Sequence, residues 1–137
     1  MNLQLVEAAV TRLPESYEPL LLTFYRAPLE VVEGAVVIGT DDDAELRVDL
    51  ADGRVSSVDP EGDLPSRFVN SSMDQLADAI AAYRDYAARV CDVIDDDEAT
   101  RLVHELRRRL EAMDAGAISD PDGWWSLILE QAEHGLL

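Results

Sequence analysis

A stretch in the first half of the chain alternates between apolar and polar residues from position 44 to position 50. A period of two is typical of a β-strand with one buried face and one wet face. The residues expected to face the core are Ala44, Leu46, Val48 and Leu50, and those expected to face solvent are Glu45, Arg47 and Asp49. Asp52-Gly53 supplies the turn for a hairpin back into residues 54–58. That return strand is poorly patterned, because it contains two serines, and is expected near a sheet edge.

Other segments extend this pattern into a mixed fold. Short apolar runs predict further extended segments at residues 20–25, 36–38 and 64–69. Helical spacing of apolar residues predicts a short first helix that ends before Pro14. Three later helices are expected: residues 72–93, a second from about Asp97 to a stop at Gly116, and a third from Asp120 and Pro121 to Gly135. The prediction is an α+β fold, a small and mainly antiparallel sheet packed with helices in one domain over residues 1–137.

The start of the long helix carries a capping signal. Ser71 fits the N-cap, where its hydroxyl accepts from a backbone N–H of the first turn, and Asp74 stands three residues further on, as in a capping box. Apolar residues then recur at helical spacing and predict one buried face, formed by Met73, Leu76, Ile80, Tyr83 and Val90.

Charge narrows the range of partners. The 137 residues include 29 acidic and 11 basic side chains, so the formal net charge is −18, and every basic residue is Arg. This excess repels nucleic acid and anionic membranes and attracts a basic partner at long range. Solubility alone is the alternative explanation for it. The hydrophobic content of 47% argues against general disorder.

Several features of the sequence bear on the cellular compartment of the protein. Its longest apolar runs are far shorter than the roughly 18 residues that a membrane span needs, and the first ten residues lack the basic start of a secretory signal. Cys91 is the single cysteine, which excludes an internal disulfide and suits a reducing cytoplasm. We expect Cys91 to be a small apolar filler near the end of the long helix.

Two acidic runs, Asp41-Asp42-Asp43 and Asp95-Asp96-Asp97, are candidates for cation binding, because Ca²⁺ and Mg²⁺ prefer several carboxylate oxygens. Neighbouring residues in an extended loop point apart, however, and neither run has the alternating spacing of a calcium loop. We therefore expect solvated acidic loops, with Asp96 or Asp97 also capping a helix. No metal or other cofactor is predicted.

The sequence contains no recognisable catalytic motif. His104 and His134 have no neighbouring Cys or His at zinc-ligand spacing, and there is no nucleophile elbow and no phosphate-binding glycine loop. Residues 107–109 are a run of three Arg, for which pairing with nearby Glu105 and Glu111 is the expected role.

The tryptophan pair Trp124-Trp125 has two interpretations. Adjacent helical positions point about 100° apart, so one ring can enter the core while the other stays at the surface. A core anchor is one role for this pair. The other is an exposed Trp at a partner interface, where this residue type is enriched among binding hot spots.

The order of these segments resembles the SUKH superfamily, particularly its fourth family of bacterial immunity proteins. The most specific piece is Phe68-Val69-Asn70-Ser71-Ser72, which follows the predicted hairpin and leads into the long helix. Residues 17–24 resemble the early segment of the family, residues 34–40 and 44–50 its hairpin strands, and residues 124–130 its closing aromatic helix. The acidic stretch at residues 91–98 departs from that pattern.

The resemblance implies a non-enzymatic immunity protein that binds and neutralises a cognate toxin in the producing bacterium. Toxins paired with this superfamily often act on nucleic acids, so their substrate-binding faces must be basic. The expected partner-binding residues are Asp41, Asp42, Asp43, Glu45, Asp49, Asp95, Asp96, Asp97, Trp124 and Trp125. The alternative is an intracellular scaffold or regulatory module of the same fold that has no toxin partner.

Overall fold

The computed structural model describes residues 1–135 and combines an antiparallel sheet with helices. The strands are β1 (Ser16–Tyr17), β2 (Leu22–Phe24), β3 (Glu30–Val32), β4 (Ala35–Asp41), β5 (Ala44–Asp49), β6 (Val55–Val58) and β7 (Arg67–Asn70). Within the described residues the helices are α1 (Leu3–Val10), the 3-10 helix η1 (Glu18–Leu20), α2 (Met73–Val90), α3 (Asp96–Met113), α4 (Ala115–Ser119) and α5 (Trp124–Glu133). The α+β class predicted from the sequence is confirmed.

The strand order of the sheet is β1-β2-β4-β5-β6-β7, and all pairs are antiparallel. β3 pairs with the first half of β4, while β2 pairs with its second half. β6 lies between β5 and the edge strand β7, so it sits near an edge as expected but is paired on both sides. Its second partner, β7, returns only after a loop, and the residues of β6 do not encode that long-range pairing.

β4 passes very close to β2 at Gly39. A Cβ at this position would lie 2.0 Å from the carbonyl oxygen of Thr23, so only glycine permits the approach. The register between β4 and β5 shifts by one residue between Val37 and Gly39, as at a β-bulge. This close packing holds the second half of β4, and the turn that follows it, against β2.

The register predicted for β5 is confirmed at its centre. Leu46 and Val48 are 1% and 0% exposed and belong to the hydrophobic core, whereas Asp49 is exposed. The remaining residues of the alternating stretch are half-buried: Ala44, Glu45, Arg47 and Leu50. The period of two therefore holds at the middle of the strand and weakens at its ends.

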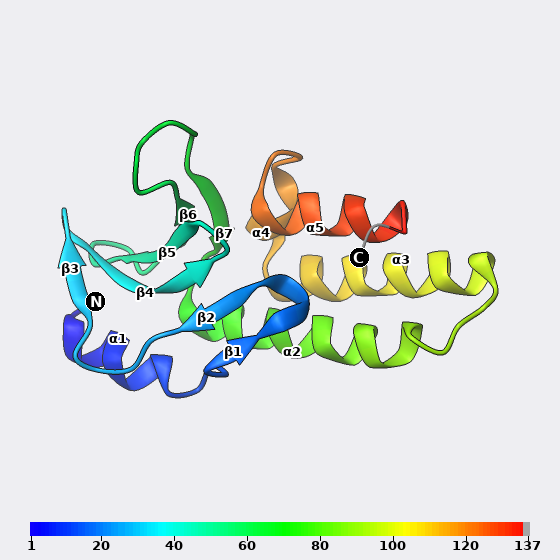
Figure 1. The fold of residues 1–137 in the computed structure, drawn as a ribbon, viewed down its shortest axis with the longest axis horizontal. Helices are drawn as coiled ribbons and strands as arrows, with labels where there is room; N and C mark the ends of the chain where they lie inside the picture. Colours follow the sequence, from blue (N-terminus) through cyan, green and yellow to red (C-terminus); the bar gives the residue numbers. More distant parts are fainter. Residues whose placement is uncertain (136–137) are drawn as a thin grey trace.

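The helices form a layer that extends well beyond the sheet. In Figure 1, α2 and α3 run side by side as a long hairpin, and α5 lies against α3. α1 lies near the end of α2 that is closer to the sheet, away from the α2–α3 connection. Tyr83 on α2 is the centre of an aromatic cluster, with ring centroids 6.2 Å from Tyr17, 5.6 Å from Tyr86 and 6.3 Å from Trp125. This cluster joins the β1–β2 hairpin, α2 and α5 in one core.

Two predicted helix ends differ from the structure. α3 ends at Met113 because Asp114 leaves the helical conformation, with φ −159° and ψ 86°. Gly116 consequently lies inside the short helix α4 and is not the stop. Asp120 does not cap the last helix: its carboxylate accepts from the N–H of Asp122 in a turn, and α5 starts after Gly123.

Candidate partner-binding groove

A groove with a volume of about 430 Å³ lies beside the turn between β4 and β5. We call it the acidic groove, and it is lined by residues 19–21, 41–44, 57, 64, 67, 124, 127, 128 and 131. These residues come from η1 and the residue after it, the β4–β5 turn with the strand ends beside it, β6, the loop before β7, the start of β7, and α5. The fold therefore brings together one predicted acidic run and one predicted tryptophan.

Asp41 and Trp124 form the wall of the groove. The indole N–H of Trp124 donates a hydrogen bond to the Asp41 carboxylate, although the two residues are 83 positions apart. Burial raises the pKa of the half-buried Asp41 carboxyl above its ordinary value, the hydrogen bond from Trp124 opposes this shift, and the charge of Asp42 adds to it. A positive charge that approaches Asp41 would stabilise its ionised carboxylate, which burial and Asp42 disfavour.

Asp42 and Asp43 form the tip of the β4–β5 turn and are exposed. Within residues 1–135 neither has an Arg or His side chain within ion-pair distance. Arg67 lines the same groove, but its guanidinium donates to the backbone carbonyl of Asp122 at 2.9 Å. The groove therefore contains three carboxylates and one guanidinium, so its net charge is negative, and Asp42 and Asp43 have no ion-pair partner among the described residues.

The groove also exposes apolar surface. Leu21 is 57% exposed and Leu64 is 67% exposed, while Trp124 and Ile128, which line the same groove, are buried. Leu21 has a left-handed backbone with φ 57°, which is uncommon for a residue other than glycine, Asn or Asp. Single exposed apolar residues are ordinary, but these two line one cavity that also contains convergent charged groups, which makes the groove a candidate binding surface.

Glu45 and Asp49, the other residues predicted on this hairpin, do not line the groove. Glu45 forms an ion pair with Arg47 at 2.6 Å. Asp49 accepts a hydrogen bond from the N–H of Ala51 at 2.7 Å in the next turn. Local contacts therefore account for both side chains.

The second acidic run lies elsewhere and has a structural role. Asp95 is the N-cap of α3 and accepts from the N–H of Asp97 at 3.0 Å, so the expectation that Asp96 or Asp97 provides the cap is wrong. Negative charge is favourable at the N-terminus of a helix, because the helix dipole is positive there. In Figure 1 the α2–α3 connection lies at the far end of the helical hairpin from the sheet.

Both tryptophans are core residues in this structure. Trp124 is 5% exposed and Trp125 is 0% exposed, so neither ring is available as an exposed hot spot. Trp125 donates its indole N–H to the side-chain oxygen of Asn70 at 2.9 Å. Both adjacent rings are buried in packed aromatic contacts: Trp124 packs edge-on against Trp125 with ring centroids 4.8 Å apart, and Trp125 packs against Tyr83.

The Asn70-Ser71 corner is held by a buried carboxylate, a role that the cap interpretation missed. Asp114 accepts from the Asn70 amide at 3.0 Å, from the Ser71 N–H at 2.8 Å and from the Ser71 hydroxyl at 2.7 Å. The N-cap of α2 is instead Ser72, whose hydroxyl accepts from Gln75 N–H at 3.2 Å. Two adjacent serines both suit a cap locally, and only the position of Asp114 assigns their roles.

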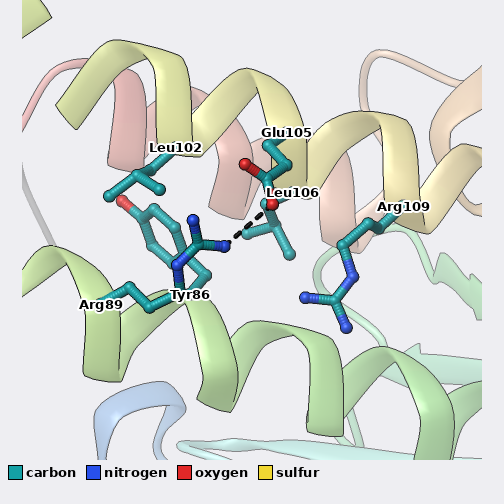
Figure 2. A pocket seen from close by; sticks show the side chains of 6 residues that line it. All are labelled: Tyr86, Arg89, Leu102, Glu105, Leu106 and Arg109. Carbon is teal, nitrogen blue, oxygen red and sulfur yellow. Dashed lines mark hydrogen bonds and ion pairs between the residues drawn. The ribbon is translucent and has the colours of Figure 1, made fainter. Parts of the chain in front are cut away.

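The contact between α2 and α3 offers no room for a ligand. Figure 2 shows Tyr86 and Arg89 of α2 facing Leu102 and Glu105 of α3, with Arg89 and Glu105 paired at 2.9 Å. The remaining crevice has a volume of about 10 Å³, enough for roughly one water. We therefore assign this contact a packing role.

The basic run at residues 107–109 pairs differently from the expectation. Arg107 pairs with Glu133 on α5 at 3.3 Å, and Arg109 pairs with Asp85 on α2 at 2.8 Å. The predicted partners Glu105 and Glu111 are not used by these two residues. The run therefore joins three helices.

The expectation that Cys91 fills the core is wrong. Cys91 is exposed at the end of α2.

Metal-binding clusters and membrane-spanning helices are absent from the part of the chain that the structure describes. Residues 1–135 contain no group of three His, Cys, Asp or Glu side chains arranged to hold a metal ion. None of the helices in that range is both long and apolar enough to cross a membrane. The acidic groove is therefore the candidate binding site among the described residues.

Fold and groove together define an acidic α+β protein with a groove that combines carboxylates with exposed leucines. The profile of the SUKH-4 immunity protein family matches residues 8–131, nearly the whole chain, and the protein belongs to this family. The resemblance noted in the sequence is thereby confirmed. Neither the curated proteins nor the solved structures include a significant match to the chain.

Proposed function

We propose that this protein is a non-enzymatic, cytoplasmic immunity protein that binds a cognate toxin domain and blocks its active surface. Family membership supports an immunity role, since the family is one of immunity proteins. The observation that carries the proposal is the acidic groove, where Asp42 and Asp43 have no counter-ion among the described residues and Leu21 is exposed beside them. The whole chain acts as one domain in this proposal.

The partner that best fits this surface is a basic, nucleic-acid-targeting toxin. Such a toxin needs positive charge to hold phosphate groups. A net charge of −18 attracts a basic face from a distance and accelerates encounter. Carboxylates of the groove would then occupy phosphate-binding positions, while the leucines bury apolar area at the centre of the contact.

The test is co-expression with the toxin domain encoded beside the gene of this protein, followed by purification of the complex. We expect the toxin to kill the host alone and to be harmless with this protein. We also expect the two chains to co-purify and to associate more slowly as salt rises. Full toxicity together with no complex would overturn the proposal and favour a scaffold or regulatory module.

A matched pair of variants locates the binding surface within that complex. Asp42→Asn with Asp43→Asn removes two charges from the groove, and Asn suits the left-handed backbone of Asp42. Asp78→Asn with Glu111→Gln removes two exposed charges from α2 and α3, outside the groove. We expect the first pair to slow association at least about tenfold and the second by much less. Equal effects would place the interface elsewhere.

A further inference from the structure

Resting on the proposed function, we propose that the acidic groove holds an arginine side chain from a protruding loop or hairpin of the partner, and that an aliphatic residue next to this arginine packs against Leu21 and Leu64. This inference goes beyond the attraction of a basic partner in general. It assigns the groove a defined recognition element with a charged part and an apolar part.

The carboxylates support the charged part. Asp42 and Asp43 are consecutive residues of one turn, and the half-buried Asp41 continues the negative rim into the groove wall. A guanidinium is flat and has five N–H donors, so it can bond two carboxylates at once, whereas an ammonium group acts as a compact point charge. Arginine is also weakly hydrated, which suits a surface that combines carboxylates with leucines.

The leucines support the apolar part. Leu21 and Leu64 are the most exposed leucines among residues 1–135, at 57% and 67%, and both line the groove. Ile94 is more exposed still, at 97%, but it lies in the α2–α3 connection, outside every cavity lined by these leucines. A partner residue placed between acid and leucine would cover apolar surface that the fold leaves in water.

The size and net charge of the groove favour a cationic side chain over an anionic ligand or a second copy of this chain. A volume of about 430 Å³ lies in the range of roughly 300–1,000 Å³ that is typical of pockets for small ligands, so a few side chains fit. A phosphate-bearing ligand such as a nucleotide would meet three carboxylates against the single guanidinium of Arg67 and be repelled on balance. A second copy of this chain would bring another net charge of −18.

The two tryptophans provide a reporter and an internal control. The indole N–H of Trp124 bonds to Asp41 in the groove, whereas the indole N–H of Trp125 bonds to buried Asn70. These are the two tryptophans of the chain, so a proton–nitrogen NMR spectrum contains two indole signals. Occupation of the groove should move the Trp124 signal and leave the Trp125 signal nearly unchanged.

The probe is the capped peptide acetyl-Leu-Arg-Leu-amide, titrated into the full-length protein at low salt. Three matched peptides replace Arg by Lys, replace Arg by its neutral analogue citrulline, or replace both Leu by Ala. We expect saturable shifts of the Trp124 indole and of the amides of residues 41–44, with dissociation constants of order 1 mM. Binding should weaken about threefold or more with Lys or Ala and be lost with citrulline.

Variants make the result decisive. Asp42→Asn with Asp43→Asn should abolish the titration, Leu64→Ser should weaken it about threefold or more, and Asp78→Asn with Glu111→Gln should leave it unchanged. Unperturbed spectra elsewhere confirm that each variant is folded. The inference is overturned if Arg, Lys and citrulline peptides shift the protein equally, if the shifts centre on residues 95–97, or if no saturation occurs up to about 10 mM.

Failure here is distinguishable from failure of the proposed function. Protection of cells from the toxin, with no peptide binding, would keep the immunity role and reject the arginine site. Peptide binding by a protein that gives no protection would keep the recognition element and reject the toxin as its source.

Discussion

The backbone N–H of Asp42 donates a hydrogen bond to the carbonyl oxygen of Leu21 at 3.1 Å, and both residues have left-handed backbones, with φ of 52° and 57°. This bond ties the β4–β5 turn to the end of η1, so the acidic and apolar parts of the groove are held by one contact. Asp tolerates this conformation, but Leu does so at a cost of about 1–2 kcal/mol.

Leu21 is predicted to lower the stability of the free protein and to strengthen its binding to the partner. Leu21→Asn should raise the free energy of unfolding by about 0.5–1 kcal/mol, because Asn suits the left-handed conformation and little of the Leu21 side chain is buried. Urea denaturation of the purified variant measures this. The same variant should bind the toxin domain more weakly. A clear loss of stability would mean that Leu21 packs against its own protein and is not free for a partner.

The two serines at the start of α2 are predicted to respond differently to the same change. Ser72→Ala should cost about 0.5–2 kcal/mol through loss of the cap. Ser71→Ala should cost about 1–3 kcal/mol, because the buried Asp114 loses one of its donors.

Aspartate at each position separates the two roles. Ser72→Asp retains a good N-cap and should unfold near the wild-type urea midpoint. Ser71→Asp would face the Asp114 carboxylate and should destabilise the protein more than alanine does. If Ser71→Asp proved as stable as the wild type, Asp114 would not hold this corner.

The two acidic runs are predicted to differ in their effect on folding. Asp95→Ala should cost about 0.5–2 kcal/mol, because it removes the cap of α3. Asp42→Asn with Asp43→Asn should cost less than about 0.5 kcal/mol or add stability, since these exposed like charges repel one another. Thermal or urea unfolding at low salt compares the variants. Equal losses from both sites would contradict the distinction between a capping run and a binding run.

Tyr83 is predicted to make the fold sensitive to alkali. Burial is the main cause that raises the pKa of Tyr83 from its ordinary value of 10 to about 12, with smaller contributions from Tyr86 and Tyr17. The unfolded chain loses this proton near pH 10, whereas the folded protein keeps it. The stability from neutral Tyr83 is therefore complete below pH 10 and is lost as pH rises to about 12.

The variant Tyr83→Phe isolates that effect. It cannot ionise, so between pH 8 and pH 11.5 it should lose about 2 kcal/mol less stability than the wild type. Urea midpoints measured at pH 8, 10 and 11.5 provide the comparison, with Tyr25→Phe as the control at an exposed tyrosine. Parallel losses in all three proteins would show that Tyr83 titrates normally.

Local patterns were sufficient to predict the class of fold and part of its register. The alternation around Leu46 and Val48 identified the buried face of β5, and helical spacing identified the buried side of α2 through residues such as Leu76 and Tyr83. These predictions succeeded because side-chain direction repeats with a period of 2 in strands and 3.6 in helices. A short stretch of chain is enough to define either period.

The functional assignment of individual residues needed contacts between distant segments. The sequence presents two similar runs of three aspartates, and both suit a partner or solvent equally well. The fold places one run at the N-terminus of α3, where the helix dipole accounts for it, and the other beside Trp124, 83 residues away from Asp41.

The family, the α+β class and the strong negative charge were therefore determined by composition, periodicity and segment order, all of which can be read along the chain. The tertiary structure alone decided that Ser72 rather than Ser71 caps α2, that both tryptophans are buried, and that Leu21 and Leu64 line one groove with Asp42. The physical reason is that hydrogen bonds and cavities depend on which surfaces meet after folding, and residues such as Ser71 and Asp114, 43 positions apart, meet only in the folded chain.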